Sequence, residues 1–137
     1  LKAASEGVSL HLSVSPDTPF AYGDIAMTER VLDNLLNNAI HHTPTTGTIA
    51  VATSINGPWV TVSVSDSGPG IEAEHLAHIF DPFYRGDRTD KSSQHAGLGL
   101  AIAKRIMDMQ NGQITAANAA SGPGSIFSFQ LPLHRAS

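Results

Sequence analysis

The chain has 137 residues, of which 41% are hydrophobic and 15% are charged, so it can bury a core as one folded domain. Its formal net charge of −4 at pH 7 argues against a large basic face for nucleic acid or acidic lipid. Cysteine is absent, which excludes a disulfide framework and a thiolate metal site. The sequence opens without Met and holds no apolar run of membrane-spanning length, so we expect residues 1–137 to be a single domain of a longer protein.

The first third of the chain predicts a strand followed by a helix. Apolar and polar residues alternate over residues 8–14, which predicts a half-buried strand. Asp24 is a suitable N-cap for a helix over residues 25–42, and Thr43-Pro44 ends that helix. The apolar face of the helix is expected to carry Val31, Leu32, Leu35, Leu36, Ala39 and Ile40.

A β-hairpin is predicted next, with strands over residues 48–55 and 59–66. The inward face of the first strand is expected to carry Ile49, Val51 and Ile55. The matching face of the second strand carries Val60, Val62, Val64 and Asp66. A carboxylate on an apolar strand face must be paired or hydrogen-bonded, so Asp66 calls for a functional or structural explanation.

The second half of the chain predicts a short helix over residues 72–77, a long polar loop, a longer helix over residues 98–109 and two closing strands. A loop of that length inside a compact domain is usually functional. Asn111-Gly112 ends the longer helix, whose apolar face is expected to carry Leu98, Ile102, Ile106 and Met109. The strands are expected over residues 113–118 and 125–131. This order predicts a two-layer α/β fold, with one sheet and helices on one face.

A polar stripe runs along the first long helix. Asn34, Asn38 and His41 lie at i, i+4 and i+7 and therefore share one face. Asparagine is unfavourable inside a helix, and its amide oxygen suits a hard cation such as Mg²⁺. The alternative is an ordinary solvated helix face. A zinc site from His41 and His42 is less favoured, because adjacent helical residues diverge by about 100°.

Two glycine-rich segments suit a ligand. In DSGPG, Gly68 and Gly70 follow Asp66, so the backbone can turn sharply and a purine amine can approach the carboxylate. In HAGLGL, Gly97 and Gly99 are expected at a helix N-terminus, which is an anion site. For DSGPG, the alternative is a tight turn in which the aspartate has a structural role. For HAGLGL, the alternative is a helix that packs closely against a strand.

Five motifs follow one another along the chain: LDNLLNNAIHHTP, DSGPGI, IFDPFYR, HAGLGLAIAKRIMDMQNG and GPGSIFSFQLP. In order and spacing they resemble the boxes of the ATP-binding catalytic domain of sensor histidine kinases, a GHKL ATPase, over about residues 8–133. The resemblance implies a Bergerat-type α/β sandwich with a mixed five-stranded sheet, about three helices on one face and a mobile ATP lid over about residues 86–96. The general style of the segments FYRGDR and HAGLGLAI resembles that of the metal-responsive sensor kinases.

The resemblance also implies which residues hold the adenine. Asp66 would accept a hydrogen bond from the adenine amino group, and Gly68 and Gly70 would leave room for the purine. Ile71 would contact the nucleotide. His42 stands where the family often has an aromatic residue against the base.

On the phosphate side, the resemblance implies that Asn38 binds Mg²⁺ through its amide oxygen, with Asn34 in the same metal site. His41 stands where the family often has a lysine near the phosphates. Tyr84 and Arg85 would move with the lid toward the terminal phosphate, and Asn38 and Arg85 would be the catalytic residues. Backbone N–H groups would meet the phosphates at Gly97, Leu98, Gly99 and Leu100.

The implied activity is transfer of the γ-phosphoryl group from Mg-ATP to a histidine of a separate dimerisation domain, with a response regulator downstream. None of the seven histidines has the acceptor context of the family, so we expect the acceptor on a domain absent here. The resemblance further implies a monomeric cytoplasmic domain of a bacterial inner-membrane sensor, without nucleic-acid or membrane contact of its own.

Two alternatives stay open. One is a degenerate nucleotide-binding regulatory module of the same fold, supported only by His41 and by His95, where the family commonly has glycine. The other is a related ATPase of the superfamily, such as a serine kinase acting on anti-sigma-type partners, a topoisomerase or a chaperone. The run GLGLAIAKRI after DPFYR favours the histidine kinases.

Overall fold

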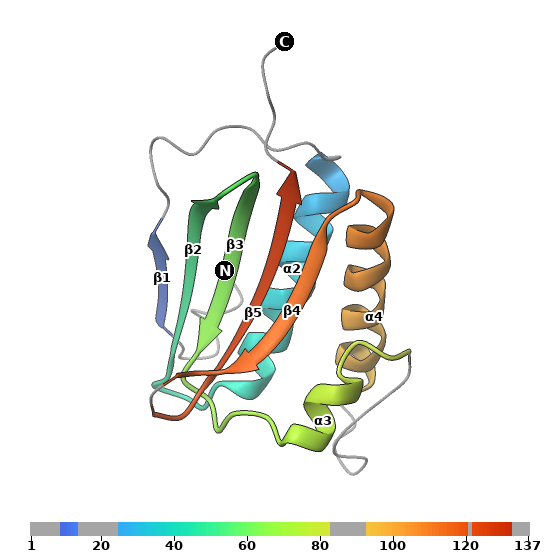
Figure 1. Cartoon of the computed structure of the whole chain (residues 1–137). Helices are drawn as coiled ribbons and strands as arrows, with labels where there is room; N and C mark the ends of the chain where they lie inside the picture. Colours follow the sequence, from blue (N-terminus) through green and yellow to red (C-terminus); the bar gives the residue numbers. More distant parts are fainter. Residues whose placement is uncertain (1–8, 14–24, 83–92, 121, 133–137) are drawn as a thin grey trace.

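The computed structural model describes the backbone of residues 9–13, 25–82, 93–120 and 122–132, and the side chains of residues 26–55, 57–82, 99–120 and 122–132. Its elements follow the order β1 (Ser9–Ser13), α2 (Ile25–His42), β2 (Thr48–Asn56), β3 (Trp59–Asp66), α3 (Ala73–His78), α4 (Ser93–Met109), β4 (Gln113–Asn118) and β5 (Ser125–Pro132) (Figure 1). Among the helices of these ranges, none has the length and hydropathy needed to cross a membrane.

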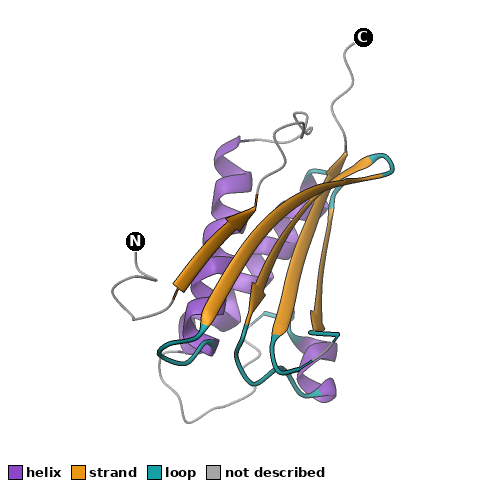
Figure 2. Ribbon diagram, turned by 90° about the vertical axis from the view of Figure 1, so that its left-hand side faces the viewer, coloured by secondary structure: helices purple, strands orange, loops and turns teal. Residues whose placement is uncertain are grey.

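One five-stranded sheet runs in the order β1-β2-β3-β5-β4. The outer strand β1 pairs with β2 in parallel, and the other neighbours pair antiparallel, so the sheet is mixed. Helices α2 and α4 lie side by side on one face of the sheet, and α3 lies at one end of it (Figures 1 and 2). The predicted two-layer α/β fold is therefore confirmed.

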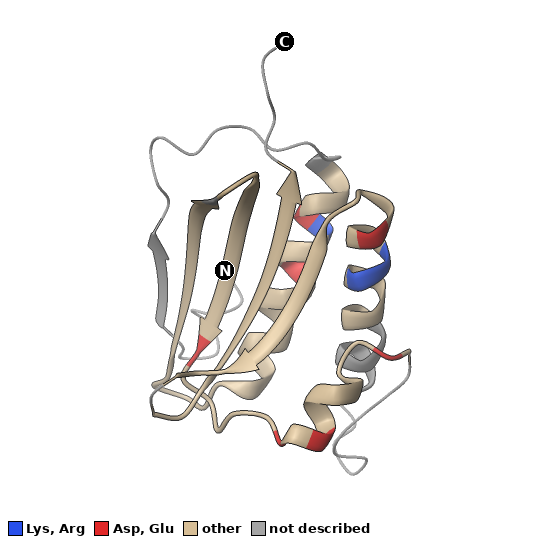
Figure 3. Ribbon diagram, viewed as in Figure 1, with Lys and Arg blue, Asp and Glu red and all other residues tan. Residues whose placement is uncertain are grey.

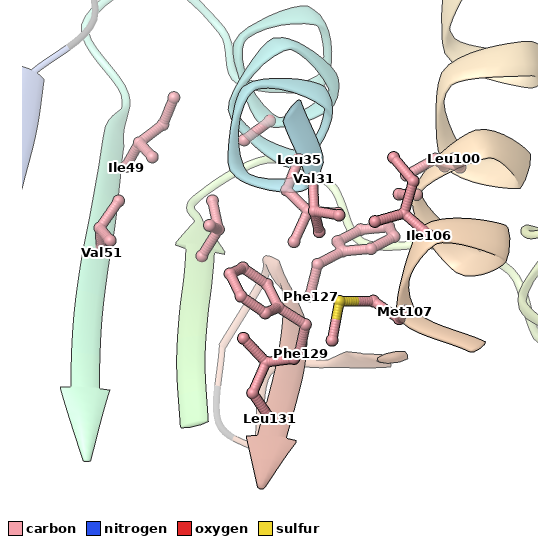
Figure 4. Close-up of a cluster of buried hydrophobic side chains, with 13 residues drawn as sticks. Val31, Leu35, Ile49, Val51, Leu100, Ile106, Met107, Phe127, Phe129 and Leu131 are labelled. Atoms are coloured by element: carbon pink, nitrogen blue, oxygen red, sulfur yellow. The ribbon is translucent and has the colours of Figure 1, made fainter. Parts of the chain in front are cut away.

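The core lies between the helix pair and the inner sheet face (Figure 4). Phe127 and Phe129 of β5 are each 1% exposed, and burial of such side chains stabilises a fold by about 1.5–3 kcal/mol each. The predicted alternation in β5 and the predicted apolar face of α2 are confirmed. Phe80, in the segment after α3, packs edge-on against Phe127 with ring centroids 6.2 Å apart, which ties that segment to the core.

Helix α4 departs from the prediction in where it begins and in the last residue of its predicted apolar face. It begins at Ser93, five residues before the predicted start. No proline interrupts the segment before Gly97, and a glycine lowers helix propensity by only about 1 kcal/mol relative to alanine. Met109 is 74% exposed, whereas Met107 is fully buried, because two helical residues turn the side chain by about 200°.

Two smaller predictions also need correction. Helix α3 is shifted by one residue, to Ala73–His78. Ile55 is 48% exposed, because it lies beside the hairpin turn at the end of β2. The predicted helix stop at Asn111-Gly112 is confirmed: Asn111 has φ 58°, and the N–H of Gly112 donates to the carbonyl of Met107 at 2.8 Å.

Candidate functional site

Strand β3 and helix α2 end, and helix α4 begins, at the same end of the molecule (Figure 1), so Asp66 and Asn38, near the ends of β3 and α2, belong to that end. One row of paired residues crosses the sheet there, in the order Ile49, Asp66, Ser125 and Asn118. Paired residues of neighbouring strands point to the same face, so this row places three polar side chains on the face that the helices cover. Among Asp, Glu, Lys and Arg, Asp66 is the one such residue in the described strands (Figure 3).

Asp66 is only 7% exposed, and its carboxylate is held by two donors. The N–H of Gly68 donates to Oδ1 at 2.9 Å, and the hydroxyl of Ser125 donates to Oδ2 at 2.6 Å. A carboxylate has about four acceptor positions, so about two stay available for a ligand donor. The geometry thus explains how the acid is tolerated beside the valines and leaves it able to bind an amine.

Ser125 is a site residue that the sequence prediction missed. It is 1% exposed and occupies an inward position of β5, in phase with Phe127, Phe129 and Leu131. The signal was the same as at Asp66: a polar residue at the end of an otherwise apolar strand face. Only the register of β3 against β5, which pairs Asp66 with Ser125, shows that the two belong together.

The first glycine segment packs tightly at this end of the sheet. A Cβ on Gly68 would lie 2.3 Å from the carbonyl oxygen of His42, at the end of α2. Gly70 has φ +87°, a conformation that side chains other than glycine rarely adopt. Gly68 therefore allows contact between the loop and α2, whereas the predicted room for a purine stays a prediction. The predicted contact of Ile71 with the nucleotide also stays one, and its partly buried side chain packs on the core.

Asn38 is buried in α2, one turn before the end of the helix. It is 1% exposed, and within the described residues neither its amide oxygen nor its amide nitrogen has a hydrogen-bond partner. Leaving such a buried group unsatisfied costs about 1–3 kcal/mol of stability, and a bound ligand that interacts with the amide would remove this cost. The alternative of a solvated helix face is wrong for Asn38. A free amide oxygen is a ligand that Mg²⁺ accepts, so the residue fits that metal.

Asn34 and the two histidines have different surroundings. Asn34 is half-buried, and its Nδ2 donates to the carbonyl oxygen of Gly99 at 3.0 Å, which ties α2 to α4. Its predicted place in the metal site stays a prediction. His41 and His42 are exposed in the last turn of α2, where a positive charge would be favourable. In the described part of the chain, no three His, Asp or Glu side chains gather as a metal site.

The second glycine segment lies inside α4 rather than at its start. The N–H groups of the N-cap and of the first three helical residues lack intrahelical partners, so in α4 these groups end at residue 95. Gly97 and Gly99 fall beyond them, which corrects the predicted helix start. Leu100 is 2% exposed and packs in the core, so only its backbone could meet a phosphate. Tyr84, Arg85, the lid up to residue 92 and the side chain of Leu98 lie outside the described residues.

Comparison with known proteins agrees with this geometry. A sequence model of the family described as histidine kinase-, DNA gyrase B-, and HSP90-like ATPase matches residues 23–135. The sensor histidine kinase RcsC of Escherichia coli (strain K12) is 36% identical over 131 residues, which cover 94% of this chain and 14% of RcsC. The chain therefore spans about a seventh of the length of that relative.

Solved structures give the same result. A nucleotide-free catalytic domain of histidine kinase ThkA superposes with a TM-score of 0.82 at 29% identity, over 96% of this chain and 83% of that one. Full-length ShkA in complex with AMPPNP gives a TM-score of 0.82 at 30% identity, over 99% of this chain and 28% of ShkA. ThkA in complex with response regulator protein TrrA gives 0.78 at 28% identity, over 97% and 36%. The chain belongs to the family of histidine kinase-, DNA gyrase B- and HSP90-like ATPases, with the sequence and fold of the catalytic domain of a sensor histidine kinase.

Proposed function

We propose that this domain binds Mg-ATP at the end of the sheet marked by Asp66 and Asn38, and that it presents the γ-phosphoryl group to a histidine on a separate dimerisation domain. The proposal rests on one observation: two buried polar side chains, Asp66 and Asn38, can still form interactions with a ligand. Asp66 keeps about two acceptor positions, and Asn38 keeps its whole amide. A purine amine and a hard cation are the complementary partners.

The domain would act by positioning rather than by covalent chemistry. Asp66 would orient the base, and Asn38 would hold Mg²⁺, which when bound neutralises phosphate charge. The acceptor imidazole would attack the γ-phosphorus with its neutral nitrogen, as the bond to the ADP oxygen breaks. No general base in this chain is needed, because that nitrogen already carries a lone pair. Arg85, Tyr84 and the Gly97–Leu100 backbone would complete the phosphate contacts.

The relatives support, in general terms, the partners that we propose for this domain. RcsC is about seven times longer than the matched segment, which leaves room for further domains, and one ThkA structure includes a response regulator. The proposed partners are a dimerisation domain that carries the acceptor histidine, as the family resemblance implies, and a response regulator downstream. The domain by itself would be a monomer on the cytoplasmic side of a sensor in the bacterial inner membrane.

Asp66→Asn tests the base contact directly. The variant keeps the size of the side chain but loses the charge and one acceptor oxygen, so we expect the affinity for Mg-ATP to fall by about tenfold or more. Titration calorimetry of the intact chain and the variant measures this loss. Thr115→Ala is the matched control, because Thr115 is an exposed polar residue of β4 at a distance from the row.

Phosphotransfer to a supplied dimerisation domain then separates the remaining alternatives. A histidine kinase yields an acid-labile phosphohistidine, whereas a serine kinase yields an acid-stable product. An intact chain that binds Mg-ATP but transfers nothing would favour the degenerate regulatory module. An intact, folded chain that does not bind Mg-ATP would overturn the proposal.

A further inference from the structure

The side chain of Asn118 holds the backbone of Ile71 with both of its polar atoms. The N–H of Ile71 donates to Oδ1 of Asn118 at 2.7 Å, and Nδ2 of Asn118 donates to the carbonyl oxygen of Ile71 at 2.7 Å. Two residues of an antiparallel ladder exchange hydrogen bonds in the same way. The amide of one side chain thus replaces a strand and joins the loop after Asp66 to the edge of the sheet. We call this pair of bonds the Asn118 clamp.

The clamp belongs to the same row as the buried carboxylate. Asn118 pairs with Ser125 across β4 and β5, and Ser125 pairs with Asp66 across β5 and β3. Ser125 donates to Asp66, and Asn118 holds the loop that leaves Asp66, so the row fixes both the acid and the loop. The clamp is therefore part of the polar row that contains Asp66, and not an isolated contact between two surface loops.

The opposite end of the loop is also held. The N–H of Ser67 donates to the carbonyl of Thr48 at 3.1 Å, and the N–H of Thr48 donates to the hydroxyl of Ser67 at 2.9 Å. Between the two ends, a Cβ on Gly70 would lie 3.1 Å from Oδ1 of Asn118, so the loop passes close to the clamp. Residues 67–71 are therefore anchored at both ends, and Asn118 supplies the anchor farther from β3.

We infer that Asn118 is a positioning residue for the nucleotide: its clamp on Ile71 keeps residues 67–71 in the conformation that receives the base beside Asp66. This inference rests on the proposed Mg-ATP function. A loop ordered before binding spares the ligand the entropy cost of ordering it, so the clamp contributes to affinity without touching the ligand. The transferred phosphoryl group lies at the other end of ATP, so the rate at saturating ATP does not depend on the clamp.

Two variants and one control test the inference. Asn118→Ala removes both bonds, and Asn118→Asp keeps an acceptor for the Ile71 N–H but loses the donor to the Ile71 carbonyl. Thr115→Ala removes an exposed polar side chain of the same strand. Without nucleotide, hydrogen exchange of the Ile71 amide, followed by NMR, reports the clamp itself. We expect faster exchange in Asn118→Ala, a smaller change in Asn118→Asp and none in Thr115→Ala.

With nucleotide, the variants should raise the KM for Mg-ATP and leave kcat with a supplied dimerisation domain unchanged. Two solvent-accessible hydrogen bonds correspond to about a fivefold rise for Asn118→Ala, with a smaller rise for Asn118→Asp. A purely structural role would instead lower kcat together with the melting temperature. Asn118→Asp carries the test if Asn118→Ala fails to fold.

Either of two results would overturn the inference: an unchanged exchange rate at Ile71, or faster exchange with an unchanged KM. If the intact chain does not bind Mg-ATP, the proposed function fails and the inference falls with it. The Ile71 exchange rate distinguishes that case, because it reports the clamp in the absence of nucleotide.

Discussion

At the scale of single residues, the site consists of polar side chains in positions that the fold would otherwise fill with apolar ones. Asp66 and Ser125 satisfy one another, so their burial is compatible with a stable sheet. Asn38 is different, because its amide is buried and finds no partner in the described residues. A buried group kept at a cost to stability is typical of a functional position.

Replacing Asn38 with an apolar residue of similar size should therefore separate stability from function. We expect Asn38→Leu to raise the free energy of unfolding by about 1–3 kcal/mol, because it removes an unsatisfied buried amide. The affinity for ATP should lose its dependence on Mg²⁺, since the amide oxygen is gone. Urea denaturation measures the first effect and calorimetry with and without Mg²⁺ the second.

Asn37 provides the matched control for this experiment. It is the same residue type at the preceding position of α2, but it is exposed. Asn37→Leu should change the free energy of unfolding by less than about 0.5 kcal/mol and leave the response to Mg²⁺ unchanged. A clear loss of stability in Asn38→Leu would show that the Asn38 amide is satisfied, contrary to our interpretation.

At the scale of elements, the ends of α2 and β3 meet through a backbone contact. The loop after β3 approaches the last turn of α2 so closely that a Cβ on Gly68 would lie 2.3 Å from the His42 carbonyl oxygen. A backbone atom cannot move aside as the end of a flexible side chain can. The glycine therefore sets how near the loop with Asp66 comes to the helix with Asn38.

Gly68→Ala should push these two elements apart. We expect a loss of about 1–3 kcal/mol in the free energy of unfolding, together with weaker Mg-ATP binding. Gly57→Ala is the control, because a Cβ there meets nothing within 4 Å, although its φ of +61° still causes some strain. That variant should lose about 1 kcal/mol and bind Mg-ATP normally. Equal binding by Gly68→Ala and the intact chain would refute the importance of this contact.

Helices and strands with a strong periodic pattern could be predicted from the sequence. Features that depend on tertiary packing, such as which face of helix α4 is buried and which distant strands pair, could not. The apolar spacing of α2 and the Thr43-Pro44 stop predicted its bounds, and alternation predicted β4 and β5. The predicted N-cap Asp24 lies outside the described residues. For α4, the predicted apolar face ended at Met109, whereas packing in the core buries Met107 and leaves Met109 exposed. Similarly, Asp66 could be singled out from its strand, but its bond to Ser125 depends on a pairing between distant strands.

At the scale of the whole molecule, the candidate site joins the two layers of the fold. Asp66 belongs to the sheet, Asn38 belongs to the helix layer, and Asn34 ties α2 to α4 near the second glycine segment. A ligand that contacts both layers would bind the folded chain only, since unfolding separates Asp66 from Asn38. Binding should consequently stabilise the domain as a unit.

Thermal unfolding with nucleotide tests that expectation. At a Mg-ATP concentration of about 100 times Kd, the folded state gains about 2.7 kcal/mol, which corresponds to a rise in Tm of about 10 °C for a domain of this size. ATP with a chelator should give a smaller rise, because Asn38 then has no metal to hold. In Asn38→Leu, the two additions should give the same rise, whereas Asn37→Leu should behave as the intact chain. A shift that is independent of Mg²⁺ in the intact chain would mean that the metal does not bridge the nucleotide and α2, and Asn38 would then need another ligand.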